Sequence, residues 1–291
     1  RAALHEALET AERALAIESS APAHGAMAWA FMVLGTFEEE SGADPRENLR
    51  RATQAFEQCI ALRPDDTVFN DLGLVYTRLA RYLKGRGEDP SDSLRKSIDA
   101  YRKSLERNPG QSAALTNLGS TLFEKGDYEM EHGVDPRESL GEAIESFERA
   151  IAVNPEQVAA LFNMAKSYDS LANYALGLGE DPRAMLEKAS DSYRAAVDVS
   201  PPGSLYAHLL YTGIGSALDA LAHYQWMTGE DPDETIAKAV AGYDDALSKN
   251  PKHFHALGNL GIIRPFQAEC ALARCQDPHE WVSSAVRASR A

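Results

Sequence analysis

Apolar residues along most of this chain recur at the spacing of one face of an α-helix. Leu94, Ile98, Tyr101 and Leu105 are separated by four, three and four residues. The same spacing is found at Leu140, Ile144, Phe147 and Ile151, and at Ile236, Val240, Tyr243 and Leu247. No stretch alternates apolar and polar residues as a half-buried β-strand does. The pattern therefore predicts amphipathic helices throughout and an all-α fold.

Two independent proline series show that these helices belong to a repeat. Asp-Pro pairs begin at residues 44, 89, 135, 181, 231 and 277, with spacings of 45, 46, 46, 50 and 46. A second series of prolines, at 64, 109, 155, 201 and 251, has spacings of 45, 46, 46 and 50. Because both series share one register and one four-residue excess, each period is a structural unit. Each unit holds two helices, and neither can bury its apolar face alone.

The Asp-Pro pairs lie in a recurring acidic segment. Gly87–Pro90 reads Gly-Glu-Asp-Pro, and the same letters return at 179–182 and 229–232. Asp is favoured at a helix N-cap, Pro at the first helical position, and Gly at the end of the preceding helix. An acid such as Glu47 or Asp92 follows three residues after most of the Asp residues, which suggests a capping box. A calcium loop would need several alternating oxygen ligands that this segment lacks. We therefore interpret it as the turn of a helical hairpin.

The repeat divides the chain into predicted units within a single solenoid. Residues 3–19 read as an orphan second helix. Helix pairs follow at about 22–63, 66–108, 111–154, 157–200, 204–250 and 253–291. The four-residue excess between residues 201 and 215 lengthens either an inter-unit connection or the start of the next helix. Pro265 lies inside the last first helix, which we expect it to kink. Since residue 1 is not Met and the pattern starts within a unit, we expect a fragment of a longer protein.

The units resemble tetratricopeptide repeats (TPR). In that family a first-helix Leu-Gly pair precedes a second-helix Ala-x3-Phe motif, another small residue and a proline. Here the first part is seen at Leu72-Gly73, and the second at Ala143, Phe147, Ala150 and Pro155. The match recurs over nearly the whole chain. The resemblance implies an all-α, right-handed α-α superhelix, a TPR-like solenoid of about six antiparallel helix pairs.

The units differ from the family in length. The family repeat has 34 residues, so about twelve are added here, around the Asp-Pro turn. Long hairpins with Gly-Glu-Asp-Pro turns are similar to those in the C-terminal arrays of bacterial Hanks-type serine/threonine kinases. The chain itself holds no glycine-rich phosphate loop, no His-Arg-Asp and no Asp-Phe-Gly motif, so it contains no kinase domain.

Composition narrows the class of partner. The net charge of −15 and the pI of about 5.0 disfavour nucleic acid and anionic membranes as partners. No apolar run approaches the length of a membrane span. The three cysteines form no disulfide framework, and Cys59 reads as a small packed residue. These features favour a cytoplasmic protein without a nucleic-acid or membrane partner.

Sequence motifs for catalysis, metals or cofactors are absent, so we predict no enzyme and no cofactor. The eight histidines are scattered, and His253-x-His255 has no metalloprotease context. His208 and His223 are fifteen residues apart in one predicted helix, too far to share a ligand. Gly213-x-Gly215 follows a helical run instead of a strand, so it is no dinucleotide fingerprint. Isolated surface or packed histidines explain the pattern better than a metal site.

Binding to a protein or peptide is the remaining function. Stacked hairpins curve into a superhelix whose concave groove is lined by the first helices. By the family pattern, groove-facing positions flank each Leu-Gly pair. The predicted partner-binding residues are Trp29, Asn70, Arg78, Thr116, Ser120, Phe123, Phe162, Lys166, Asp169, Ser216 and Asp219. TPR domains that bind a C-terminal carboxylate carry more Lys, Asn and Arg, so this groove does not match such a clamp. The alternative is a polar, solvated wall without a ligand.

Two further recurring residue types are assigned structural roles. Asn117, Asn163 and Asn259 precede the motif's Leu or Met and are expected to brace neighbouring helices. Four tyrosines recur near the ends of the first helices, and we interpret them as core seals of the long hairpins. They are Tyr82, Tyr128, Tyr174 and Tyr224.

The sequence thus predicts a non-catalytic interaction or regulatory scaffold. Its partner would be a peptide, another protein's domain, or another domain of the same chain. Two alternatives stay open: the sensor or substrate-recruiting arm of a bacterial serine/threonine kinase, and an architectural module that self-associates. A hydrolase has no supporting residues.

Overall fold

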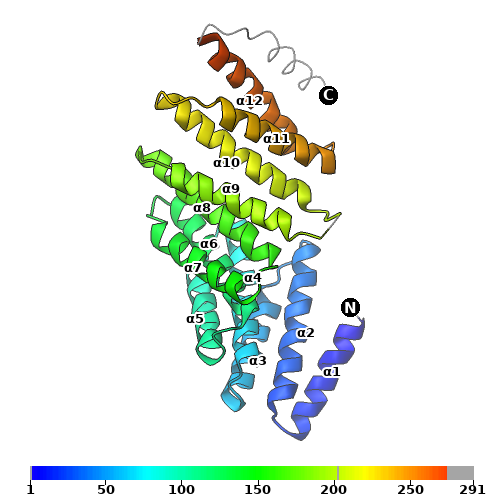
Figure 1. Ribbon diagram of the computed structural model, residues 1–291. Coiled ribbons are helices and arrows are strands. Elements are labelled where there is room, and N and C mark those ends of the chain that lie inside the picture. Colours follow the sequence, from blue (N-terminus) through cyan, green and yellow to red (C-terminus); the bar gives the residue numbers. More distant parts are fainter. Residues whose placement is uncertain (1, 202, 274–291) are drawn as a thin grey trace. The chain divides into compact units, whose positions relative to one another are not determined.

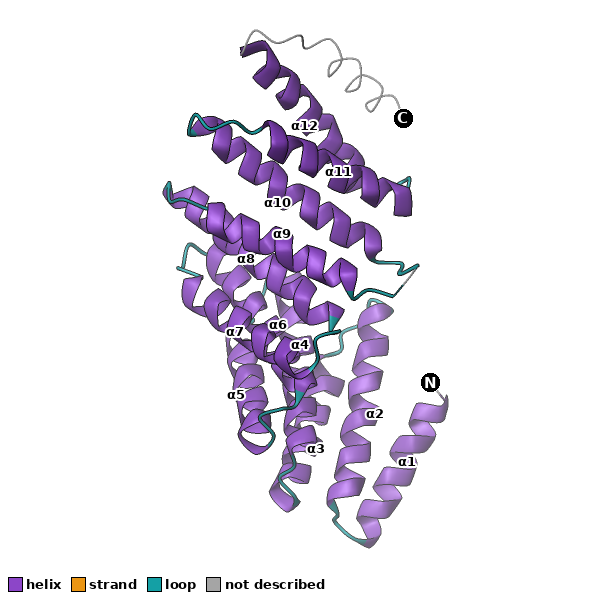
Figure 2. Cartoon of the chain, viewed as in Figure 1, coloured by secondary structure: helices purple, strands orange, loops and turns teal. Residues whose placement is uncertain are grey.

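The computed structural model describes residues 2–201 and 203–273. Within these residues the chain forms α-helices joined by short loops and no β-strand, as Figures 1 and 2 show, which confirms the all-α prediction. The helices are α1 Ala2–Ile17, α2 Ala21–Glu40, α3 Arg46–Leu62, α4 Asp66–Gly85, α5 Ser91–Arg107, α6 Ser112–Glu131, α7 Arg137–Val153, α8 Val158–Leu178, α9 Arg183–Asp198, α10 Ala207–Met227, α11 Asp233–Lys249 and α12 Phe254–Ala273. The predicted second helix of the last pair and Cys275 lie outside the described residues.

The chain divides into two compact units. The N-terminal unit extends to Tyr128, and the C-terminal unit begins at Glu129. Within each unit consecutive helices pack as antiparallel neighbours, α1 to α5 in the first and α7 to α12 in the second (Figure 1). This arrangement confirms the prediction of a TPR-like fold built of helix pairs. That both units continue one solenoid stays a prediction.

The Asp-Pro turns cap the second helices, as predicted. The Asp44 carboxylate accepts a hydrogen bond from the backbone N–H of Arg46 at 3.0 Å. Asp89, Asp135, Asp181 and Asp231 accept the equivalent bond in the other described turns. The preceding glycines have φ values between 71° and 81°, which a residue without Cβ adopts without strain.

The predicted capping box is wrong at the two turns where the acid's contacts are clearest. Glu47 accepts hydrogen bonds from Arg50 and Arg51 of its own helix instead of from the Asp44 backbone. Asp92 pairs in the same way with Arg95 and Lys96. Basic residues three and four positions along the helix offer each carboxylate a charged donor, which competes with the backbone N–H.

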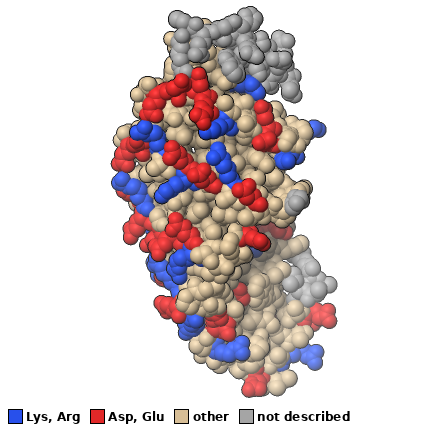
Figure 3. Space-filling model, viewed as in Figure 1, with Lys and Arg blue, Asp and Glu red and all other residues tan. Residues whose placement is uncertain are grey.

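Three turns are joined to the next turn by an arrangement that we call the turn clamp. The Arg46 guanidinium binds Asp44 of its own turn, reaches Glu88 of the following turn at 3.2 Å, and lies 5.7 Å from the centroid of the Tyr82 ring. Arg137 with Glu180 and Tyr174, and Arg183 with Glu230 and Tyr224, repeat it. In Figure 3, red and blue side chains crowd the left edge of the upper part, where such turns lie. These ion pairs are solvent-exposed, so each contributes little to the stability of the fold.

The interpretation of the recurring tyrosines as core seals is wrong. Tyr82, Tyr174 and Tyr224 are half-buried and lie against the clamp arginines. The Tyr128 hydroxyl donates to Asp89 at 3.2 Å. A ring near the end of a lengthened helix reaches the neighbouring turn, where a guanidinium can cover its face.

Close packing explains why the Leu-Gly pair of the TPR motif contains glycine in this chain. A Cβ atom added to Gly73 would stand 2.7 Å from the Tyr101 ring, and one added to Gly215 would stand 2.6 Å from the Tyr243 ring. Both tyrosines are fully buried. The small motif residues of the second helices, among them Ala143, Ala150, Ala239 and Ala246, are also fully buried. First and second helices approach closely because both carry small residues where they meet.

Three local features of the sequence can be located in the structure: the four-residue excess, Cys59 and Pro265. The four-residue excess lengthens a connection, since residues 199–206 join α9 to α10 whereas residues 154–157 join α7 to α8. Cys59 is buried, as predicted, and burial raises the pKa of its thiol. Helix α12 continues through Pro265; a kink there stays a prediction.

Candidate functional site

The first helix of the N-terminal unit's first pair carries an apolar stripe. Trp29, Val33 and Phe37 of α2 lie four residues apart and are 44%, 39% and 42% exposed. The indole N–H of Trp29 donates to Asp71 Oδ2 of α4 at 3.1 Å. The same indole meets Phe56 of α3 edge to face, at 6.5 Å between ring centroids. The stripe is thus fixed in orientation against α3 and α4 while its apolar atoms remain accessible.

Polar residues of α4 adjoin this stripe. Asp71 accepts hydrogen bonds from Trp29 and, at 3.4 Å, from the Asn70 amide, and burial raises its pKa. The Asn117 amide of α6 donates to Asn70 Oδ1 at 3.0 Å, which confirms the predicted bracing role of that asparagine. Arg78 is half-buried, and its Nε atom has no hydrogen-bond partner. We call α2, α4 and α6 up to Tyr128, with these side chains, the N-terminal wall.

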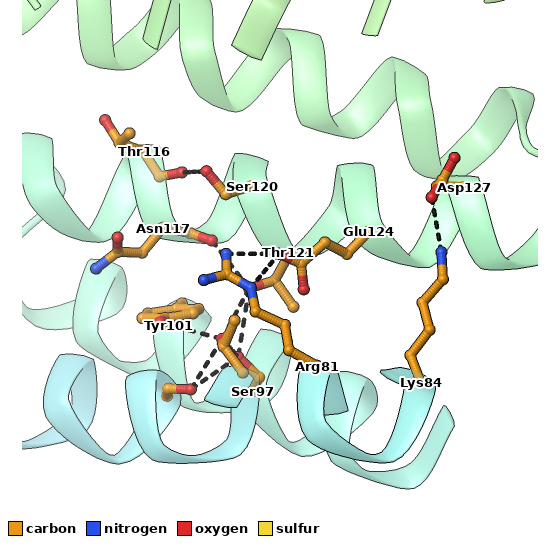
Figure 4. Close-up of polar contacts among 12 residues, drawn as sticks. Arg81, Lys84, Ser97, Tyr101, Thr116, Asn117, Ser120, Thr121, Glu124 and Asp127 are labelled. Carbon is orange, nitrogen blue, oxygen red and sulfur yellow. Dashed lines mark hydrogen bonds and ion pairs between the residues drawn. The ribbon is translucent and has the colours of Figure 1, made fainter. Parts of the chain in front are cut away.

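Charged and hydroxyl groups link α4 to α6 within this wall (Figure 4). Arg81 donates to Glu124 at 2.6 Å, and Lys84 donates to Asp127 at 2.7 Å. Beneath them, Thr77 Oγ1 lies 2.7 Å from Ser97 Oγ and 3.0 Å from Thr121 Oγ1 in a fully buried hydroxyl network. The network satisfies hydroxyls that would otherwise be buried without partners.

The predicted site residues of α6 differ in accessibility. Thr116 is buried, and its hydroxyl donates to the Ser112 carbonyl, so it offers no exposed group to a partner. Ser120 is half-buried and donates to the Thr116 carbonyl at 2.8 Å. Phe123 is half-buried. Thr116 is therefore removed from the set of candidate binding residues.

In the C-terminal unit the first helices α8, α10 and α12 form what we call the C-terminal wall. Asp169 of α8 accepts a hydrogen bond from the Tyr193 hydroxyl at 2.8 Å, and burial raises the pKa of this carboxyl to about 6. Phe162 lies 5.8 Å from the Tyr193 ring, and the Lys166 ammonium lies 6.0 Å from the Phe162 ring. The structure therefore brings together the three residues that the sequence predicted on α8.

Ser216 and Asp219 also share one tyrosine. Tyr243 donates to Asp219 Oδ2 at 3.2 Å and lies 3.5 Å from Ser216 Oγ. Asn259 of α12 donates to Ser216 at 3.2 Å, as its predicted bracing role requires. The predicted residues of α10 thus contact the second helix α11 and the next first helix α12.

An aromatic and imidazole cluster extends this wall and was missed from the sequence. His223 Nδ1 lies 2.9 Å from Asp219 Oδ1, and hydrogen bonding to Asp219 raises the pKa of the imidazole. Its ring stacks on Phe266 of α12 at 3.9 Å, and Trp226 meets Phe266 edge to face. The four-residue spacing of Asp219 and His223 was the available signal; the contact with Phe266 depends on how α10 and α12 pack.

The polar and aromatic groups of the two walls are of kinds that make noncovalent contacts. They include an exposed indole, hydrogen-bonded carboxylates, a guanidinium and a stacked imidazole. Among residues 2–201 and 203–273, no three His, Cys, Asp or Glu side chains are placed to hold a metal ion. No helix in these ranges has the length and apolarity to cross a membrane.

Comparison with known proteins supports the fold. The sequence profile of the plant specific mitochondrial import receptor subunit TOM20 family matches residues 92–216, which is less than half of the chain. No curated protein sequence matches.

Solved structures match over most of the chain. The nuclear import adaptor Nro1, whose structure is known from S. pombe, is 12% identical, has a TM-score of 0.64, and the match covers 98% of this chain and 92% of that one. MamA is 19% identical with a TM-score of 0.50, covering 77% of this chain and 92% of its own. PilF of Pseudomonas aeruginosa is 13% identical with a TM-score of 0.50, covering 84% and 87%. At these identities the likeness shows the fold, which is that of a TPR-like helical-repeat protein.

Proposed function

We propose that this chain is a non-catalytic scaffold that binds a segment of another protein along its first-helix walls. The observation that carries the proposal is the stripe of Trp29, Val33 and Phe37, three large apolar side chains of one helix face that are about two-fifths exposed. Contiguous exposed apolar side chains bordered by polar ones are typical of protein interaction sites. Aromatic and Arg residues are the common anchors of such sites.

The chemistry of the N-terminal wall specifies the kind of segment. Apolar side chains of the partner would cover Trp29, Val33 and Phe37. A carboxylate of the partner would pair with the guanidinium of the half-buried Arg78. Asn70, Ser120 and Phe123 border this contact. In the C-terminal wall, Phe162, Lys166, Asp169, Ser216 and Asp219 are the proposed counterparts. The adaptor role described for Nro1 is consistent with a fold of this kind serving recognition.

The finer context of this scaffold is also a proposal. The lengthened hairpins with Gly-Glu-Asp-Pro turns favour the sensor or substrate-recruiting arm of a bacterial serine/threonine kinase. The coding sequence upstream of Arg1 tests this alternative, since a kinase domain there would carry the catalytic motifs. A buried thiol such as that of Cys59 suits a cytoplasmic location. Self-association is the remaining alternative, and light scattering over a concentration series tests it.

A single-tryptophan protein tests binding at the N-terminal wall. Trp226→Phe and Trp281→Phe leave Trp29 as the sole indole of the chain. We expect a peptide selected against the whole chain from a display library to shift the Trp29 emission to shorter wavelength, because the peptide removes the exposed indole from water. Adding Val33→Ser and Phe37→Ser should weaken binding by roughly tenfold or more.

The matched control is Leu62→Ser, at a similarly exposed apolar residue of the second helix α3. This change should leave the affinity as it was. Peptides that bind without moving the Trp29 emission, and that bind the Val33→Ser, Phe37→Ser protein equally well, would contradict the assignment of this wall.

A further inference from the structure

One end of the C-terminal unit departs from the acidic character of the chain. The chain carries 44 Asp and Glu residues in 291, yet residues 199–218 and 246–268 contain none. The same two stretches supply Lys249, Lys252 and three histidines, His208, His253 and His255. In a protein of net charge −15, these two stretches are therefore free of acidic side chains and carry basic ones.

The fold brings these two stretches together. The connection between α9 and α10 and the connection between α11 and α12 lie at the same end of the helices (Figure 1). The rings of His208 and His253 are 4.6 Å apart, and those of His253 and His255 are 5.7 Å apart. The Lys249 ammonium lies 5.9 Å from the ring of Tyr211. The nearest acids along α9 and α11, Asp198 and Asp245, precede this end.

Large apolar side chains are exposed at the same end. Leu205 is 85% exposed, Tyr206 70% and Phe254 78%. A cavity of about 560 Å³ at this end is lined by Leu205, His208, Tyr211, Lys249 and Asn250, among others. The four-residue excess of the α9–α10 connection supplies Leu205 to this cavity, and the shorter connections of the other units have no equivalent segment.

We propose that this surface, made of Leu205, Tyr206 and Phe254 with Lys249, Lys252 and His208, docks an acidic segment of a partner protein that carries bulky apolar residues. We call it the basic end. An apolar side chain of the partner would enter the cavity and contact Leu205 and Tyr211, and other apolar side chains would cover the exposed Tyr206 and Phe254. Carboxylates of the partner would meet Lys249 and Lys252. None of the side chains proposed above for partner binding on the first-helix walls belongs to the basic end, so the basic end is a second interaction surface.

Charge complementarity selects this partner over the alternatives. A nucleic acid long enough to extend past the basic end would meet the field of a chain with net charge −15. An acidic segment of a protein can be short enough to lie within the basic end. Its apolar side chains can also contact Tyr206 and Phe254. Attraction between opposite charges would raise the rate of encounter, and the apolar contacts would lengthen the lifetime of the complex.

The test uses the whole chain and a fluorescein-labelled peptide in which Glu and Asp alternate with Phe and Leu, followed by anisotropy. We expect saturable binding that weakens at high salt. Two double variants, Tyr206→Ser with Phe254→Ser and Lys249→Glu with Lys252→Glu, should each raise the Kd by roughly tenfold or more. These side chains are solvent-exposed, so circular dichroism should show unchanged helicity.

Two controls are matched by helix and exposure. Met227→Ser changes an 80% exposed apolar residue at the other end of α10, and Lys238→Glu changes an exposed lysine of α11. Both should bind as the unchanged protein does. A peptide with Lys in place of every acid should not bind, and one with Ala in place of Phe and Leu should bind weakly.

Three results would overturn the proposal. The double variants could bind the peptide as tightly as the unchanged chain. A single-stranded oligonucleotide could compete as well as the peptide, which would make the surface a general polyanion site. Light scattering could show dimers that the Tyr206→Ser, Phe254→Ser variant loses, which would assign the surface to a second copy of the chain.

Discussion

Residues Thr77, Asp169 and Asp219 occupy one register position, each bonded to a tyrosine 24 residues further along the chain. In the N-terminal unit the residue is a threonine, and the surrounding network of Ser97, Thr121 and Tyr101 is made of hydroxyls. In the C-terminal unit it is a carboxylate that accepts a hydrogen bond from Tyr193 or Tyr243. A buried hydroxyl network has no charge to desolvate, whereas a buried carboxylate makes stability depend on pH.

Asp169 should therefore destabilise the folded chain at neutral pH. Burial raises its pKa from 3.8 to about 6, so the folded protein retains a proton that the unfolded chain releases. The free energy of unfolding falls as pH rises from about 4 to about 6, and the loss persists above that range. Asp169→Asn removes this dependence and keeps an oxygen that accepts from Tyr193. Relative to the unchanged chain, the variant should gain roughly 1–3 kcal/mol between about pH 4 and pH 7.

Urea denaturation at a series of pH values measures this difference. Asp191→Asn, at an exposed carboxylate of α9, is the control and should show no comparable trend. If the difference between Asp169→Asn and the unchanged chain were the same at every pH, the buried carboxylate would have no role in pH-dependent stability.

At the scale of elements, the close approach of first and second helices depends on glycine. Gly215 and Gly261 hold the same place in the Leu-Gly or Ile-Gly pair of α10 and α12. A Cβ at Gly215 would stand 2.6 Å from the Tyr243 ring, whereas a Cβ at Gly261 would meet nothing within 4 Å among the described residues. The same substitution should therefore have opposite effects at the two positions.

Gly215→Ala should destabilise the chain by about 1–3 kcal/mol, because the buried Tyr243 ring would have to move. Gly261→Ala should be neutral or stabilise by about 0.5–1 kcal/mol, because Ala favours the helix and the added Cβ meets no atom of the described residues. The midpoint of urea denaturation compares them. Equal losses at both positions would mean that the glycine contributes something other than room for the tyrosine.

The elements were predictable because their determinants are local and repeated. Leu94, Ile98 and Tyr101 mark a helix face without any knowledge of its neighbours, and Asp44 caps a helix two residues away. The capping box at Glu47 and the role of Tyr82 were mispredicted because each depends on a competing side chain, Arg50 or Arg46, whose position the spacing alone does not fix.

The candidate site was less predictable, since it depends on contacts between helices. Trp29 and Asp71 are 42 residues apart and meet only after α2 packs on α4. The proximity of His208 to His253 requires the packed ends of α9–α12. The sequence shows that acids are absent around both histidines. It does not show that the two acid-free stretches lie side by side, which only the fold reveals.

At the scale of the whole molecule, the chain is a helical-repeat protein with a proposed binding wall in each compact unit and a proposed second surface at the basic end. Repeat proteins transmit little from one hairpin to a distant one, so a partner at one wall should protect only the helices it covers. This expectation distinguishes binding along the first helices from binding at turns or at a chain end.

Hydrogen–deuterium exchange of the whole chain, with and without the peptide that shifts the Trp29 emission, tests the central claim most directly. We predict slower exchange in α2 and α4 when the peptide is bound and unchanged exchange in the second helices α3 and α5. Protection confined to the second helices or the Asp-Pro turns, with α2 and α4 unaffected, would contradict the claim that the first-helix wall binds the partner.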